Sequence, residues 1–201
     1  MAHNVFICYH HANDQYYKNE LVKFGKEHKI FVDYSVGLGE IDDNLSDQEI
    51  RQIIRDEYLQ NSTVTIVLVG TDTKNRKHVD WEIYSSMYDG KINKKSGILV
   101  INLPSISGSS SIRSDHSGEK ESVFSDVKSW VSISERAEYE RRHPYMPDRL
   151  IDNFLESNSK ISVVNWSDLN VEKLTILIEN AFQDRANCKY DLSRAMRRRN
   201  S

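Results

Sequence analysis

The stretch "TVTIVLVG" (63–70), followed by "TDTKNRKHVDWEIYSSMYDG" (71–90), decides the fold. The first eight residues form a continuous β-branched run, which is typical of a strand buried on both faces of a sheet. In the second stretch Val79, Ile83 and Met87 recur at helical spacing and predict a helix that faces a core. A buried strand followed by a core-facing helix is the repeating unit of a parallel α/β sheet.

Four further runs resemble strands, and helical patterns lie between them. The runs are "NVFICY" (4–9), "IFVDY" (30–34), "GILVINLP" (97–104) and "ISVVNW" (161–166). This alternation predicts a five-stranded parallel sheet with helices on both faces. In such sheets ligands bind at the carboxyl ends of the strands, which here are 9–13, 33–39, 70–75 and the residues from 103 onward.

The chain of 201 residues suits one domain, which we expect over residues 1–185. Residues 105–122 are rich in serine and glycine and predict a mobile loop. Residues 123–160 predict a helical insertion before the last strand. The last nine residues carry four arginines, and we expect a basic tail over 186–201 that is solvated.

Composition excludes several classes of protein. The net charge of −3 argues against a nucleic-acid binder. No run approaches the roughly 20 apolar residues of a membrane span, and the N-terminus does not resemble a signal peptide, so we expect no membrane contact and a cytoplasmic location. Cys8 and Cys188 have no partner at metal-ligand or disulfide spacing and are expected to be free thiols. We expect no metal site.

Common nucleotide-binding and hydrolase motifs are absent from the sequence. The segment after the first strand, "HHAND" (10–14), lacks the glycines of a dinucleotide fingerprint, and no GxxxxGK[ST] or GxSxG occurs. A receiver domain would need acidic residues after the first strand and an aspartate after the third, where this chain has Tyr9-His10 and Gly70-Thr71. Another kind of site must therefore occupy the sheet edge.

Glu82 is the carboxylate best placed for such a site. Its helix follows the most buried strand, so the first helical turns overlook the crevice where open α/β sheets bind ligands. His78 lies one turn before Glu82, and Ser85 and Ser86 lie one turn after it. A single carboxylate among small and polar groups at this edge is a candidate ligand site.

The same helix carries an aromatic stripe that a surface helix would not need. Trp81, Tyr84 and Tyr88 lie on the side opposite Val79 and Ile83. Either the insertion covers this stripe or a second protomer does. The sequence favours the insertion and leaves a homo-oligomer open.

The motifs in this order resemble those of TIR domains. "HNVFICYHHAND" (3–14) is similar to the opening TIR strand and loop, whose usual form is close to "DVFISYxxxD". "IFVDY" resembles the second TIR strand, and residues 63–83 resemble the third strand and the helix with the catalytic glutamate. His78 stands where TIR domains have tryptophan. The form "GTxTxNRxxVxxEI" and the long insertion are most similar to TIR-like proteins of Thoeris antiphage defence, over residues 3–103 and more weakly to 185.

The resemblance implies a flavodoxin-like TIR-like fold and an enzyme that cleaves NAD+ between nicotinamide and ribose. In the Thoeris branch it implies a cyclic ADP-ribose isomer that signals to a separate effector protein. The resemblance assigns catalysis to Glu82, with NAD+ as substrate and no other cofactor. One carboxylate is chemically sufficient, because nicotinamide departs as a neutral molecule and needs no general acid, whereas most glycosidases need two acids.

Cyclisation requires a closed, dry pocket in which the adenosine half folds back before water attacks. We expect this pocket to be lined by residues of the first two strand ends and of the glutamate helix: Phe6, Tyr9, His10, His11, Asp33, Tyr34 and His78. Two alternatives remain open at this point. One is a non-catalytic TIR interaction module, and the other is a nucleoside deoxyribosyltransferase-like enzyme, which would use nucleosides and leave NAD+ intact.

Overall fold

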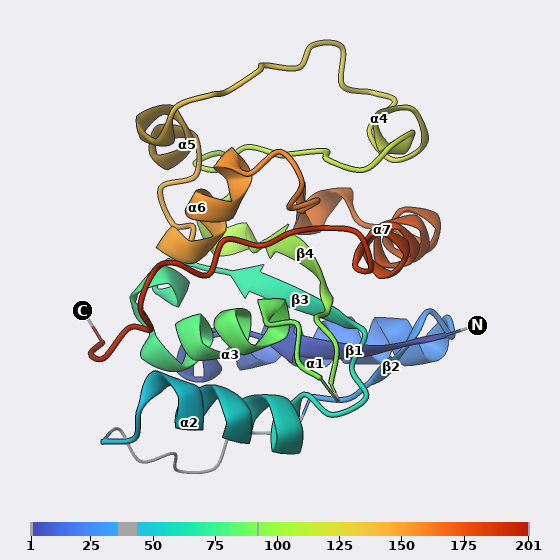
Figure 1. Ribbon diagram of the computed structural model, residues 1–201. Helices are drawn as coiled ribbons and strands as arrows, with labels where there is room; N and C mark the ends of the chain where they lie inside the picture. The colour runs from blue at the N-terminus through green and yellow to red at the C-terminus, as the bar shows by residue number, and fades with distance from the viewer. Residues whose placement is uncertain (1, 36–43, 92, 201) are drawn as a thin grey trace.

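The computed structural model describes residues 2–35, 44–91 and 93–200, and its centre is a five-stranded, all-parallel sheet (Figure 1). The strand order is β2-β1-β3-β4-β5. The strands are β1 (His3–Cys8), β2 (Phe31–Asp33), β3 (Val64–Val69), β4 (Gly97–Asn102) and β5 (Ser162–Asn165). The flavodoxin-like α/β fold expected from the alternating runs is confirmed.

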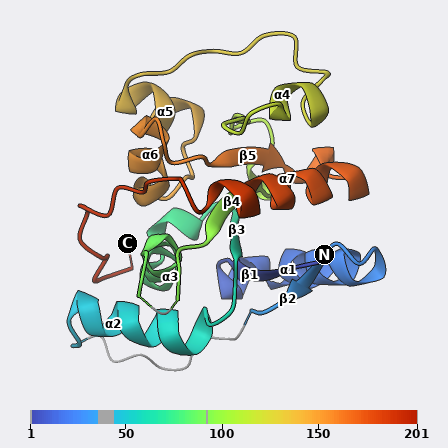
Figure 2. The same ribbon diagram turned by 45° about the vertical axis from the view of Figure 1, so that its right-hand side comes forward.

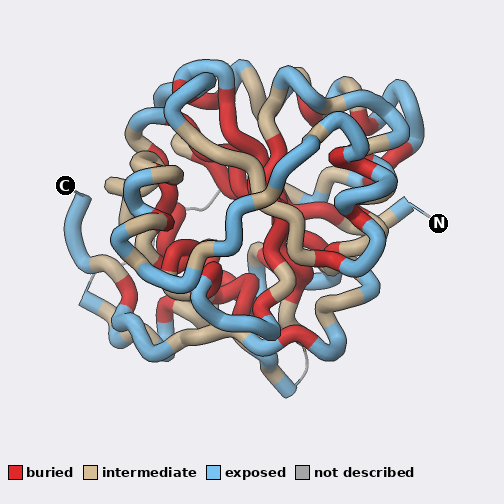
Figure 3. Tube along the Cα trace, turned by 90° about the horizontal axis from the view of Figure 1, so that it is seen from above, coloured by how far each residue is buried: buried red, intermediate tan, exposed pale blue. Residues whose placement is uncertain are grey.

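The alternation of side chains along each strand divides the core into two layers. Phe6 and Cys8 of β1 belong to one apolar cluster, whereas Val5 and Ile7 belong to the other. The central strand β3 is buried along its whole length, which explains its continuous apolar sequence. Figure 3 shows these buried segments inside a shell of exposed loops and helix faces.

Helices cover both faces of the sheet. The face that carries Phe6 and Cys8 packs against α2 (Asp47–Ile53), α3 (Lys77–Met87) and α6 (Asp148–Leu155). The other face packs against α1 (His11–Glu27) and α7 (Val171–Asp184). Ser46 and Glu49 form the expected capping box at the start of α2, which continues as a π-helical segment, Ile54–Tyr58.

The segment 105–122 is more structured than its serine-rich composition indicated. It begins with a 3₁₀ turn, Pro104–Ile106, and ends in α4 (Glu119–Ser122). Between them Arg113 pairs with Val163 of β5 in an antiparallel bridge. Buried polar side chains such as Glu119 attach the segment to the sheet, and the mobility expected of it remains a prediction. The insertion that follows becomes helical only at α5 (Arg136–Arg142), and the expected domain limits remain predictions.

The residues after α7 form a strap and not a solvated tail. Figures 1 and 2 both show this segment running back from α7 past α6 to the outer side of α3. Met196 and Cys188 are buried within it. The indole Nε1 of Trp81 donates a hydrogen bond to the Arg197 carbonyl at 2.8 Å. The expectation of a solvated end is therefore wrong, since the backbone of the tail provides hydrogen-bond partners for buried groups of α3.

The aromatic stripe of α3 is covered within the same chain. Trp81 is fully buried beneath the tail. The Arg149 guanidinium of α6 lies 4.8 Å from the Tyr84 ring centre, and the Arg51 guanidinium of α2 lies 3.8 Å from the Tyr88 ring centre. The insertion thus covers Tyr84, as expected, whereas the role of the tail at Trp81 was not predicted. A homo-oligomer remains a prediction that this stripe does not require.

Three absences hold for the described part of the chain. Cys8 and Cys188 form no disulfide and are free thiols, and both are buried, which the polar sequence around Cys188 did not indicate. Across residues 2–35, 44–91 and 93–200, no group of histidine, cysteine and acidic side chains is arranged to hold a metal ion. Within the same ranges no helix has the length and apolar character needed to cross a membrane.

Candidate functional site

Glu82 lies in the second turn of α3, where the helix packs against the sheet. Glu82 is only 3% exposed, and its Oε2 has no hydrogen-bond partner among the described residues. Burial raises the pKa of the carboxyl from 4.5 to about 8, because the charged form loses its hydration. An unsatisfied, buried carboxyl is costly for a fold and is a common feature of functional sites.

Cys8, at the carboxyl end of β1, lies next to Glu82. A hydrogen bond from the thiol opposes part of the rise in the Glu82 pKa. Burial first, and then the charge of Glu82, raises the pKa of the thiol well above its ordinary value. Cys8 also lies 3.7 Å from the Val79 carbonyl, measured from Sγ. The thiol is therefore a neutral hydrogen-bond donor in the wall of the site and not an activated nucleophile.

A second buried carboxylate, Asp14, lies in the first turn of α1 near the end of β3. It is 4% exposed, and its Oδ2 has no hydrogen-bond partner in the described structure. Burial raises the pKa of Asp14 from 3.8 to about 6, and a hydrogen bond with Thr73 opposes the rise. Gly70 permits this approach, because a Cβ there would lie 2.8 Å from Asp14 Oδ1. Asp14 thus joins the start of α1 to the loop that leads into α3.

The structure separates the residues predicted on β1. Phe6 is buried on the same face of the sheet as Cys8, in the cluster that includes α3. Tyr9 belongs to the cluster on the opposite face, where its hydroxyl donates to Gln15 Oε1 at 2.6 Å. The ring of Tyr9 stacks on His11, with 4.4 Å between ring centres. Tyr9 and His11 therefore form a pair over the start of α1 and do not line the wall that carries Phe6.

The remaining predicted residues lie at three places. Asp33 accepts a hydrogen bond from Lys18 Nζ at 2.9 Å, which ties β2 to α1. Tyr34 is 38% exposed at the end of β2, and most of the predicted strand-end segment after it, 36–43, lies outside the described residues. The pKa of His10 is lowered by burial and by Arg76 at the start of α3.

His78 belongs with the tail side of α3. Its ring centre lies 5.0 Å from that of Trp81, the residue beneath the tail. The described structure therefore brings Cys8 to Glu82 and places Phe6 in the apolar cluster on the same face of the sheet. Burial first, and to a lesser extent the charge of Glu82, raises the pKa of Tyr9. His10 lies near the entrance to α3, and the other predicted residues lie around α1, β2 and the tail.

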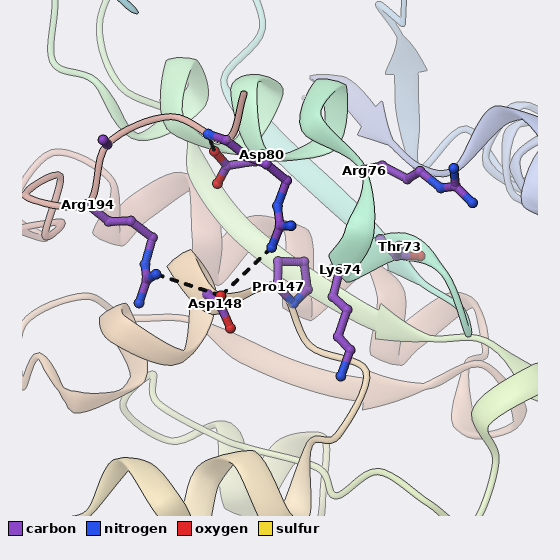
Figure 4. A pocket seen from close by; sticks show the side chains of 9 residues that line it. Thr73, Lys74, Arg76, Asp80, Pro147, Asp148 and Arg194 are labelled. Atoms are coloured by element: carbon purple, nitrogen blue, oxygen red, sulfur yellow. Dashed lines mark hydrogen bonds and ion pairs between the residues drawn. The ribbon is translucent and has the colours of Figure 1, made fainter. Parts of the chain in front are cut away.

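A small cavity of about 170 Å³ opens beside the first turn of α3 (Figure 4). Its lining includes Lys74, Asp148 and Arg194 but not Glu82. Figure 4 shows Arg194 directed toward Asp148 and Arg76 directed away from it. Arg194 Nη1 lies 3.7 Å from the Asp148 carboxylate. Asp148 also lies 3.8 Å from Arg197 Nη2, whereas Lys74 Nζ bonds to the Pro144 carbonyl. The cavity therefore lies where the tail, α3 and α6 meet, apart from Glu82.

The sequence patterns did not indicate two buried polar side chains: Cys8, which lies beside Glu82, and Asp14, which lies beside Gly70. Cys8 was interpreted only as a free thiol within an apolar strand, although strand alternation places it on the face that α3 covers. Asp14 is one residue beyond the predicted strand end, 9–13. The signal for Asp14 was the glycine at 70, whose missing side chain leaves room for a carboxylate.

The sheet order, the loop into α3 and the buried glutamate on that helix together define a TIR-like α/β domain. A comparison with protein families specifies this class further: residues 6–107 match the family described as Thoeris protein ThsB, TIR-like domain. The chain belongs to this family, which confirms the resemblance seen in the sequence motifs and places the protein in Thoeris defence. A comparison with curated proteins gave no match.

Proposed function

We propose that the protein cleaves NAD+ at the bond between nicotinamide and ribose and closes the product into a cyclic ADP-ribose isomer. The observation that carries the proposal is Glu82, a buried carboxyl with an unpartnered oxygen within the matched TIR-like region. The isomer acts as an antiphage signal that a separate effector protein binds. NAD+ is the substrate, and the reaction uses no further cofactor.

The raised pKa of Glu82 suits a cationic substrate. In the free protein a pKa of about 8 keeps the carboxyl mainly protonated at neutral pH. The pyridinium ring of NAD+ carries a positive charge, and a positive charge nearby favours the ionised carboxylate. Binding of NAD+ therefore releases the proton. The carboxylate then stabilises the positive charge that develops on the ribose as nicotinamide leaves.

Burial of Glu82 favours cyclisation over hydrolysis. At 3% exposure the carboxyl does not meet bulk water, so NAD+ reaches it only when neighbouring side chains shift. Such a site excludes water around the reacting ribose, which allows an acceptor on the same molecule to attack first. Cys8 supplies a neutral wall beside Glu82, and Phe6 belongs to the apolar cluster on the same face of the sheet. Around this centre we propose Tyr9, His10, His11, Asp33, Tyr34 and His78 as residues that hold the remainder of NAD+ once it is bound.

The test uses purified full chain with NAD+, with and without lysate from phage-infected cells. Products are separated by chromatography and identified by mass spectrometry. We expect release of nicotinamide with a product of cyclic ADP-ribose mass, and at least a hundredfold loss of both in Glu82→Gln. Glu121→Gln, a change at an exposed helical glutamate, is the matched control and should retain full activity.

Each alternative has its own outcome in this experiment. Intact NAD+ in every reaction with folded protein would favour the interaction module. Release of free base from 2′-deoxynucleosides, with NAD+ untouched, would favour the deoxyribosyltransferase-like enzyme. Formation of ADP-ribose without a cyclic product would support Glu82 as the catalytic residue and contradict the cyclisation step.

A further inference from the structure

A cavity lined by residues of the segment 111–143 is separate from the Glu82 site. It has a volume of about 470 Å³, within the range of small-molecule sites. Residues of the segments 111–114, 120–133 and 139–143 line it. In Figure 1 the connection between α4 and α5 arches over this part of the molecule. Neither the family match, which ends at 107, nor the proposed function assigns a role to this cavity.

Positive charge dominates the charged lining of this cavity. Arg113, Lys120 and Arg142 line it, and no acidic side chain does. Arg113 forms an ion pair with Asp115 at 3.0 Å, which offsets its charge. Arg142 shares Glu138 with a second arginine, so this carboxylate neutralises the two only in part. The cavity therefore favours an anion, and guanidinium groups are well suited to phosphate.

Two buried polar atoms of the lining residues lack hydrogen-bond partners among the described residues. His143 is 2% exposed, and its Nδ1 is unpartnered. Ser114 Oγ is likewise buried and unpartnered. Unpartnered buried polar atoms are rare because each one costs free energy, and a ligand that bonds to them recovers this energy. The pKa of His143 is lowered to about 4, first by burial, so its ring is neutral at physiological pH and offers one donor and one acceptor nitrogen.

An aromatic platform completes the lining. Trp130 is partly exposed in the cavity wall. Its ring makes an edge-to-face contact with Phe124, with 5.5 Å between the ring centres. Lys120 Nζ lies 5.0 Å from the centre of the Trp130 ring. An indole beside a cationic group can stack on a nucleobase, a contact worth about 1–3 kcal/mol per base. The lining thus pairs a base-stacking surface with phosphate-binding cations.

We infer that this cavity binds a nucleoside phosphate of mononucleotide size, with the phosphate held by Arg142 and the base on Trp130. Arg113, whose three guanidinium nitrogens already bond to Asp115, Ile161 and Tyr139, contributes only to the positive potential of the wall. The ligand class follows from the combination of an indole, partly neutralised positive charge and unpartnered hydrogen-bonding atoms within one cavity. The inference does not depend on NAD+ cleavage, since it concerns binding at a different face of the molecule.

The test measures binding by the full chain in isothermal titration calorimetry. AMP, GMP, CMP and UMP are titrated separately, with adenosine and inorganic phosphate as partial ligands. We expect at least one mononucleotide to bind at least tenfold more tightly than either partial ligand. Arg142→Gln and Trp130→Ala should each weaken that binding at least tenfold. Lys120→Gln, a substitution at an exposed residue, should weaken it at least threefold.

Two control variants make the result specific to this cavity. Arg141→Gln changes the neighbouring arginine, which also pairs with Glu138 but does not line the cavity, and should leave affinity unchanged. Glu82→Gln should also leave it unchanged, which excludes binding at the proposed NAD+ site. The inference is overturned if no mononucleotide binds at millimolar concentration, if phosphate alone binds as tightly, or if Arg142→Gln and Lys120→Gln proteins with parental thermal unfolding keep parental affinity.

Discussion

Arg149→Ala should release the tail from α3 and destabilise the protein strongly. The Arg149 side chain is fully buried, and its Nε and Nη2 donate to the two carboxylate oxygens of Asp80 at 2.8 and 3.0 Å. Nη1 donates to the Arg194 carbonyl at 2.9 Å and Nη2 to the Ala195 carbonyl at 3.2 Å. We call Asp80, Trp81, Arg149 and residues 194–197 the tail clamp. Arg149 is its centre, because it joins α6, α3 and the tail.

The magnitude follows from what Arg149→Ala leaves behind. Asp80, which is 8% exposed in the intact protein, would lose its guanidinium partner, and removal of one member of a buried ion pair costs about 3–5 kcal/mol. In a chain of this size, 1 kcal/mol lowers the midpoint of thermal unfolding by about 2–4 °C. We therefore expect a decrease of roughly 6–20 °C. The unfolding midpoint of Arg149→Lys should lie between those of the parental protein and Arg149→Ala, because an ammonium group keeps the positive charge but cannot form two parallel hydrogen bonds to Asp80.

Urea unfolding followed by tryptophan fluorescence measures the stability change, and limited trypsin digestion measures release of the tail. In Arg149→Ala we expect faster cleavage after Arg194 and Arg197. Arg141→Ala, a change at an arginine whose side chain is 66% exposed, should alter neither readout. A loss below 1 kcal/mol in Arg149→Ala, with cleavage at the parental rate, would refute the assignment of a structural role to the clamp.

Three further changes test other parts of the structure. Glu82 holds its proton more tightly in the folded chain, with a pKa of about 8 against an ordinary 4.5, so stability should fall by up to about 1.4 kcal/mol per unit as pH rises between these values. Urea midpoints from pH 5 to 8 should show a flatter dependence in Glu82→Gln; equal slopes would contradict the raised pKa. Gly97→Ala should cost about 1–3 kcal/mol by urea denaturation, because its Cβ would lie 1.9 Å from the Ala181 carbonyl of α7, and parental stability would disprove this close approach. Trp81→Phe removes the hydrogen bond to the Arg197 carbonyl and should cost about 1 kcal/mol, with faster amide exchange confined to the tail and α3; unchanged exchange there would contradict the proposed contact.

The sheet was predictable because its strands carry a strong local signal. Each of the five predicted strand runs overlaps an observed strand, and the buried run 63–70 forms the central β3. The helix with Glu82 was equally clear, since Val79, Ile83 and Met87 face the core as their spacing predicted. These features depend on periodicity within one element, which a single sequence records directly.

The tail was mispredicted, and the contacts of the segment 105–122 were not predicted, because both depend on distant partners. Residues 194–197 are held by Asp80, Trp81 and Arg149, and none of these contacts leaves a local pattern in the arginine-rich sequence. The segment 105–122 is held by a bridge from Arg113 to Val163 in the same way. A composition rich in serine, glycine and arginine predicts flexibility and solvation, and it carries no information about such distant contacts.

The candidate site was predictable at Glu82 and only partly around it. The position of a carboxylate after the most buried strand sufficed to identify Glu82 as the candidate. The neighbours Cys8 and Asp14 required knowledge of which way each side chain faces and how closely α1 approaches Gly70. Tyr9, just after β1, and His11, the first residue of α1, stack on each other, and their spacing in the sequence does not predict this contact.

The tail clamp also bears on the order in which the molecule assembles. It joins Asp80 to Arg149, 69 residues later, and to Arg197, 117 residues later. Contacts between segments so far apart close large loops and form after local structure. The outer face of α3 is therefore finished late in folding, and until then the Trp81 indole is open to other chains. Exposed indole surface favours aggregation, so we expect variants with a loosened tail clamp to aggregate more during refolding than the parental protein.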